Sequence, residues 1–179
     1  MIVRLTAPVF EGEANNLTDF IHAKLHPIRL ISVITDAAGH VWGPTARRCD
    51  VLLPPAAPEA SSDAQLLVEA AQRVNEKSYD LLVAIKLSLL HGSVTHRSWE
   101  RCRQLAGRIT SHYGVAVIIA QHLPALSVSK NPPPPHLHLI ILPRRLEPIG
   151  FTGFSGVPAM AAHQAITAMW RGCRDAPSG

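Results

Sequence analysis

The chain has 179 residues, of which 47% are hydrophobic and 17% charged, and this suits one globular domain rather than a disordered chain. No apolar run is long enough to cross a bilayer, and the first residues lack the pattern of a signal peptide. Three separated cysteines without a Cys-x-x-Cys motif favour a cytoplasmic protein and argue against a thiolate zinc site. A net charge of +4 and a pI near 9.3 favour an anionic partner such as nucleic acid.

The amino-terminal part of the chain predicts strands interleaved with two helices. Residues 1–10 alternate in polarity, which is typical of a strand or an extended arm. Residues 16–26 predict a short helix that ends before Pro27, and 29–35 with the turn 36–39 predict a hairpin that continues through 40–42. A short strand is expected at 49–53, a loop at 56–62, and an amphipathic helix at 63–75.

The remaining residues continue this alternation to the end of the chain. Strands are expected at 80–87 and 115–120, a helix runs from 95 or 98 to about 113, and a polar loop covers 127–135. The apolar run that begins at His136 predicts a strand ended by Pro143, followed by a glycine-rich loop at 150–156, a closing helix at 158–173 and a frayed tail at 175–179. Without repeats or a domain break, residues 1–179 predict a single α+β domain, in which helices pack on a central antiparallel or mixed sheet of about five strands.

A pair of histidines opens the run His136-Leu137-His138. Side chains on a strand alternate between its two faces, so His136 and His138 point the same way while Leu137 points into the core. Two imidazoles fixed on one face form half of a metal site, although such pairs are also common as half-exposed polar residues. Arg144 and Arg145 follow this strand and are expected to bring positive charge close to the pair.

A third histidine, His122, ends the preceding strand. If the two strands pair as neighbours, His122 approaches His136 and His138, and three neutral imidazoles with an open position suit a catalytic divalent metal. The alternative is that His122 simply caps the end of its strand.

These stretches together resemble the MobA/MobL-type relaxases, a group of HUH endonucleases. The resemblance extends from about residue 36 to residue 170 and rests on the order and spacing of several pieces. Residues 50–58 resemble an "ILLPEGAPE"-like stretch, 84–88 an "ALP-x-ELS"-like strand, and 117–122 a strand that closes on a histidine. Residues 131–138 resemble "NPHAH" with additional prolines, and 144–151 an "R-R-x-x-x-x-G-F" tail.

The resemblance implies metal binding by His122, His136 and His138, with Mg²⁺ or Mn²⁺ in function and Zn²⁺ or Ni²⁺ as other ions that the site could hold. It also implies a single-stranded DNA partner, nicking and strand transfer at a plasmid transfer origin, and other mobilisation or relaxosome proteins as further partners. In the family an amino-terminal tyrosine attacks the phosphodiester and the metal polarises the phosphate. Arg144 and Arg145 are then candidates for contacts to the DNA backbone.

The chain departs from the family at the nucleophile. Its only tyrosines are Tyr79 and Tyr113, and the position expected for the family's tyrosine falls near His26. Histidine can attack phosphorus, so His26 or His22 could take that role. The other interpretation is that the nucleophile is lost and the chain is a metal- and DNA-binding relative that does not nick.

Two further classes of function are compatible with parts of the pattern. A non-catalytic DNA-binding accessory protein would use the histidines structurally. A histidine-triad nucleotide hydrolase would need a third histidine at the next alternate position of the strand, and residue 140 is isoleucine.

Overall fold

The structure is a computed structural model that describes residues 3–6, 17–27, 42–75, 82–89, 95–123 and 134–175. For residues 3–6 the description covers the backbone alone. The strand predicted at 29–35, the hairpin turn that follows it, most of the loop 127–135, Tyr79 and all but the first residue of the tail 175–179 lie outside these residues.

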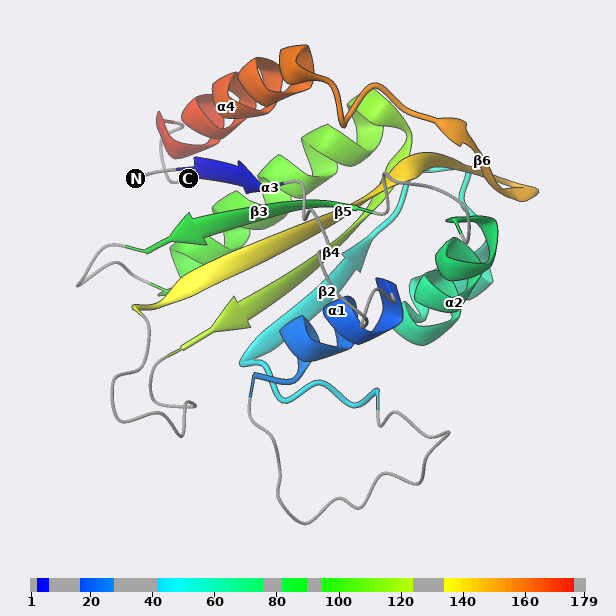
Figure 1. The fold of residues 1–179 in the computed structure, drawn as a ribbon. Helices are drawn as coiled ribbons and strands as arrows, with labels where there is room; N and C mark the ends of the chain where they lie inside the picture. Colours follow the sequence, from blue (N-terminus) through cyan, green and yellow to red (C-terminus); the bar gives the residue numbers. More distant parts are fainter. Residues whose placement is uncertain are drawn as a thin grey trace.

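A central antiparallel sheet forms the middle layer of the domain (Figure 1). Every strand pair in the described residues is antiparallel, which confirms the predicted α+β class. In spatial order the strands are β1 (Val3–Thr6), β3 (Val83–Ser88), β5 (His136–Glu147), β4 (Val115–His122) and β2 (Arg48–Leu52), with β6 (Gly150–Phe154) paired to β5.

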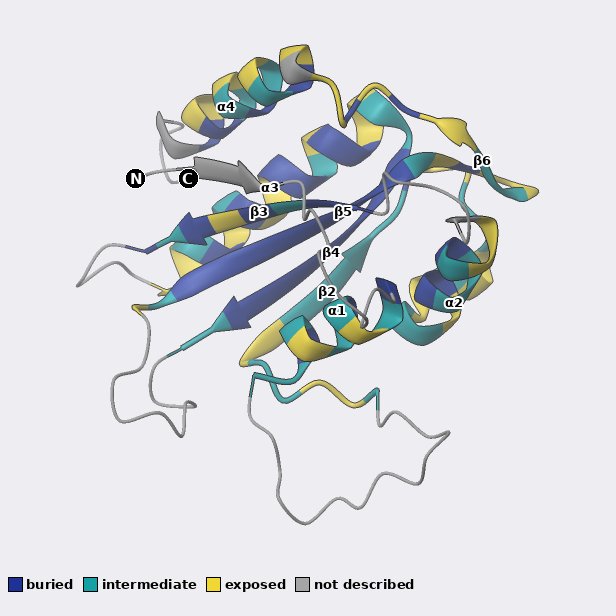
Figure 2. Ribbon diagram, in the orientation of Figure 1, coloured by how far each residue is buried: buried dark blue, intermediate teal, exposed yellow. Residues whose placement is uncertain are grey.

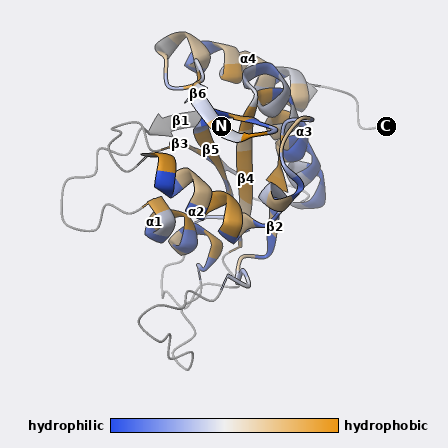
Figure 3. Ribbon diagram, turned by 90° about the vertical axis from the view of Figure 1, so that its right-hand side faces the viewer, coloured by the Kyte–Doolittle hydropathy of each residue, from blue (hydrophilic) through white to orange (hydrophobic). Residues whose placement is uncertain are grey.

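Helices cover both faces of this sheet. The pair α1 (Leu17–Leu25) and α2 (Ala64–Asn75) packs on one face, and the pair α3 (Thr95–Tyr113) and α4 (Met160–Asp175) packs on the other. The view in Figure 3 shows apolar strands between the two helix pairs. A short 3-10 helix, η1 (Glu59–Ser62), lies in the loop that was predicted before α2.

The two central strands are apolar on both sides because helices cover both faces. On β4, Ile118 belongs to the core under α1 and α2, whereas Ile119 belongs to the core under α3 and α4. On β5, Ile140 belongs to the core under α1 and α2, and Leu139 belongs to the core under α3 and α4. Figure 2 shows these strands as the most continuously buried part of the sheet. A strand covered on both faces reads as an unbroken apolar run, which is how both strands appear in the sequence.

Two predicted boundaries on the carboxyl-terminal side are wrong. Strand β5 does not end at Pro143 but continues to Glu147. Proline is tolerated there because it lies opposite Ser155, just past the end of β6. Its carbonyl accepts from the amide of Ser155, and its missing N–H would face the same residue, outside the paired strands. The predicted glycine-rich loop 150–156 begins as strand β6, which returns along β5 after a tight turn at Gly150, whose φ is 105°.

Helix α1 is held against the sheet by one apolar edge. Leu17, Ile21 and Leu25 recur every four residues and are at most 2% exposed. The amide of Leu17 donates to Gln72 of α2 at 3.0 Å, and the carbonyl of Leu25 accepts from Thr45 and Ala46. These contacts place the carboxyl-terminal turn of α1 over the end of β4 that carries His122.

Candidate metal centre

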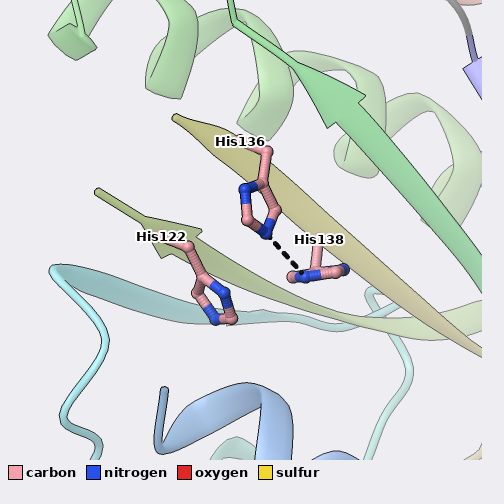
Figure 4. A group of neighbouring side chains, drawn as sticks. All are labelled: His122, His136 and His138. Carbon is pink, nitrogen blue, oxygen red and sulfur yellow. Dashed lines mark hydrogen bonds between the residues drawn. The ribbon is translucent and has the colours of Figure 1, made fainter. Parts of the chain in front are cut away.

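Three histidines meet where the end of β4 lies beside the start of β5 (Figure 4). His122 and His136 are direct partners in the β4–β5 register, which confirms that these strands are neighbours. His138 lies two residues further along β5, on the same face, while Leu137 between them is fully buried on the opposite face. We call His122, His136 and His138 the histidine triad.

The ring nitrogens of the triad lie within the reach of one metal ion. One ligand nitrogen from each ring can be chosen so that all three lie within 4.8 Å of one another. The Nε2 atoms of His136 and His138 are already 3.1 Å apart, close to the roughly 3.3 Å that separates two ligands of a tetrahedral zinc site. The triad could therefore bind a metal ion.

Backbone carbonyls fix which nitrogen of two of the rings is available. His122 Nε2 lies 2.6 Å from the carbonyl oxygen of Lys24 in α1, and His136 Nδ1 lies 2.8 Å from that of Pro134. When these nitrogens donate to the carbonyls, Nδ1 of His122 and Nε2 of His136 keep their lone pairs for a metal. Such carbonyl contacts commonly orient histidine ligands of metal ions.

Burial keeps the triad neutral. Desolvation, followed by the effects of positive neighbours, lowers the pKa of His138 to about 2 from the ordinary value of 6.5. Desolvation is also the main cause that lowers the pKa of His136 to about 4, and that of His122 moves in the same direction. Because a metal ion binds the neutral imidazole, these rings are in the ligand form at neutral pH without first releasing protons.

Two lysines near the triad were not predicted as part of the site. Lys86 of β3 is the register partner of His138, and the carbonyl of Lys24 accepts from His122. Both ammonium groups contribute to lowering the pKa of all three histidines. The one sequence signal for Lys86 was a single charge within the otherwise apolar run 81–87.

The candidate nucleophiles His22 and His26 lie on and just after the helix that contacts the triad. Their rings stack, with centroids 3.9 Å apart. The two ring nitrogens of His26 each lie 2.9 Å from a backbone carbonyl oxygen, one of His22 and one of Gly43. Attack by His26 would therefore require its ring to leave at least one of these contacts. Tyr113 packs against the core under α3 and α4, on the face opposite the triad.

The arginines that follow the histidine pair are not close to it. Arg144 lies six residues beyond His138 on the same strand, which corresponds to about 20 Å. Its guanidinium group donates to the carbonyl of Thr152 at 2.9 Å and lies 4.1 Å from the centroid of the Phe154 ring. Arg145 is exposed. The expectation that these arginines bring charge close to the histidines is wrong, because β5 continues past Pro143.

Fold and site together define an α+β protein with a candidate metal centre at one end of the two central strands of an antiparallel sheet. No protein-family model matches the chain, and a search of curated proteins finds no match. A structure solved in work on the molecular basis of vancomycin resistance transfer in Staphylococcus aureus is similar, with a TM-score of 0.61 and 16% sequence identity. The similarity covers 74% of this chain and 69% of that one, and it shows that the two chains share a fold.

The helices among the described residues were compared with the length and apolar character that a membrane span needs. None of them combines the length and the apolar character that crossing a bilayer requires.

Proposed function

We propose that this chain is a relaxase-like protein that binds single-stranded DNA and holds a divalent metal ion, Mg²⁺ or Mn²⁺, at the histidine triad. The observation that carries the proposal is the convergence of three neutral imidazoles on one face of adjacent strands. The shared fold with a structure studied for resistance transfer supports a role in nicking and strand transfer at a plasmid transfer origin.

The chain's own residues supply a rigid, electrically neutral ligand set. His136 and His138 are fixed by β5, and His122 is held through the carbonyl of Lys24. A metal ion bound here would polarise a phosphodiester oxygen and offset the charge that develops on phosphorus. Three protein ligands leave coordination positions for the phosphate.

The proposed nucleophile is His26, with His22 as the second choice. Both flank Lys24, whose backbone carbonyl contacts His122, so the segment that carries them adjoins the triad. A phosphohistidine link to DNA would be labile in acid, whereas a phosphotyrosine link would survive.

A second candidate is a relative that binds metal and DNA but does not cleave, acting as an accessory protein. It is favoured by one observation, namely that both ring nitrogens of His26 already face carbonyl oxygens. In either role we propose that the protein works in the cytoplasm with other mobilisation or relaxosome proteins, and that Arg144 and Arg145 contact the DNA backbone away from the reacting phosphate.

The test begins with metal content. Chelator-treated protein is titrated with Mn²⁺, and the His138→Ala variant should bind at least about tenfold more weakly, because loss of one of three ligands leaves an incomplete site. The matched control is His163→Ala, on α4 at the opposite face of the sheet. Equal affinity in all three proteins would rule out a metal site at the triad.

The second part of the test concerns cleavage. Single-stranded origin DNA is incubated with the protein and Mn²⁺, and covalent adducts are compared before and after acid treatment. An acid-labile adduct that is lost in His26→Ala supports the nicking role. An acid-stable adduct, or nicking that survives the His22→Ala/His26→Ala double substitution, contradicts the proposed nucleophile, and metal binding without nicking selects the accessory role.

A further inference from the structure

Lys86 places a positive charge directly beside the triad. In the β3–β5 pair it lies opposite His138, so both side chains leave the same face of the sheet. Burial along β3 agrees with this assignment, because Ile85 and Leu87 are fully buried under α3 and α4 whereas Lys86 is exposed. The lysine stem is long and flexible enough to bring its ammonium group to a ligand bound at the triad.

Lys24 brings a second positive charge to the same place. It lies in the last turn of α1, its carbonyl accepts from His122 at 2.6 Å, and its ammonium group lies 5.0 Å from the centroid of the Phe20 ring. Burial, followed by the positive charge of Lys86, lowers the pKa of Lys24. The two ammonium groups are therefore close enough to act on each other as well as on the imidazoles.

Negative charge does not balance them within the part of the chain that the structure describes. There, the groups whose positive charge lowers the pKa of the three rings are Lys24, Lys86 and, once protonated, the neighbouring histidines, with no carboxylate among them. The candidate ligand group likewise contains no aspartate or glutamate. Arg103 forms ion pairs with Asp50 of β2 and Glu100 of α3, two carboxylates that do not act on the triad.

This distribution of charge disfavours a metal ion that binds alone. Among the described residues, a divalent cation entering three neutral ligands meets two ammonium groups and no carboxylate that acts on the rings. Like charges near a protein surface repel by amounts that change affinity measurably. An anion that binds the open metal positions removes this repulsion and contacts both lysines. A phosphodiester meets these requirements, because it is anionic and presents two free oxygens, one for the metal and one for an ammonium group.

We infer that Lys24 and Lys86 form an anion subsite beside the triad, so that the metal ion and a DNA phosphodiester bind cooperatively. The inference rests on the proposed function and adds that metal affinity depends on bound DNA. The free protein holds the metal weakly, and the complex with DNA holds it tightly. By linkage, the metal must strengthen DNA binding by the same factor by which DNA strengthens metal binding.

The experiment measures Mn²⁺ affinity in low salt, with and without a short oligothymidylate, in chelator-treated protein. Wild-type affinity should rise about tenfold or more when the oligonucleotide is present. In Lys86→Met, affinity for Mn²⁺ alone should increase, and the enhancement by the oligonucleotide should shrink. Lys86→Arg should keep the enhancement. Arg171→Met is the matched control, since it removes the same charge from an exposed position of α4 on the opposite face.

The outcomes separate this inference from the proposed function. If His138→Ala binds Mn²⁺ as well as the wild type, there is no metal site at the triad and both fail. If the triad binds Mn²⁺ but the oligonucleotide leaves its affinity unchanged, or Lys86→Met behaves like Arg171→Met, the anion subsite alone is refuted. In a final measurement, inorganic phosphate replaces the oligonucleotide at the same total phosphate concentration. If inorganic phosphate raises the Mn²⁺ affinity as much as the oligonucleotide does, the assignment to a nucleic-acid phosphodiester is overturned.

Discussion

The buried triad should make the metal-free protein sensitive to mild acid. In the unfolded chain His136 and His138 have the ordinary pKa of 6.5, whereas burial lowers the pKa to about 4 and about 2 in the folded protein. Below pH 6.5 the unfolded chain therefore binds protons that the folded protein does not, and stability falls as the pH falls. Above pH 6.5 both states are neutral at these sites, and the stabilising contribution is fully present.

The size of this effect follows from proton linkage. At about pH 5.5, one unit below the unfolded pKa, each histidine removes about 1.4 kcal/mol from the free energy of unfolding relative to about pH 7.5. Together His136 and His138 should remove about 3 kcal/mol, a large share of the roughly 5–15 kcal/mol that stabilises a typical domain. Further acidification should continue the loss until the folded protein itself begins to bind protons near pH 4, the folded-state pKa of His136.

Urea denaturation at the two pH values measures this difference. The His136→Asn/His138→Asn double variant keeps polar side chains but cannot titrate, so its free energy of unfolding should change by about 3 kcal/mol less than that of the wild type over this pH range. The control is His112→Asn, at an exposed position near the end of α3, which should retain the wild-type pH dependence. If the double variant and the wild type lose the same stability between the two pH values, the argument from burial is refuted.

Three other predictions concern the backbone, the thiols and the DNA surface. Gly114 has a φ of 68°, so Gly114→Ala should destabilise the protein by about 1 kcal/mol. Gly107 lies inside α3, where a new Cβ would be 4.0 Å from the nearest atom, so Gly107→Ala should stabilise the protein by up to about 1 kcal/mol. Thermal unfolding in which both variants change the melting temperature in the same direction contradicts this. Burial raises the pKa of Cys49 to about 12 and also raises that of Cys102. Both thiols should therefore react with iodoacetamide far more slowly in native protein than in urea-unfolded protein. Equal alkylation rates in the two states, measured by mass spectrometry, would contradict this prediction. Arg145→Ala should weaken single-stranded DNA binding and make the log–log salt slope less steep by roughly 0.7, and a filter-binding titration with an unchanged slope would remove Arg145 from the DNA surface.

Local patterns were sufficient to predict much of this protein. The period-two alternation of a strand placed His136 and His138 on one face with Leu137 on the other, because that alternation depends only on extended backbone geometry. Helical periodicity likewise located both ends of α2 and α3 to within about one residue, with residue 95 the correct one of the two starts considered for α3. The prediction that His122 joins the pair needed the further condition that β4 and β5 are neighbours, which their short separation in the chain favoured.

The features that only the tertiary structure decided depend on register between segments far apart in the chain. Lys24 is 98 residues from His122, yet its carbonyl orients that ring. Lys86 reaches the triad only because β3 pairs with β5 in the register that sets it opposite His138. Pro143 lies inside a strand because it is opposite Ser155, just past the end of β6, where no ladder bond needs its missing N–H. Local sequence determines which side of a strand or helix is apolar, whereas the position of one element against another is set by the packing of the whole core, and that packing decides which charges and carbonyls surround the histidines.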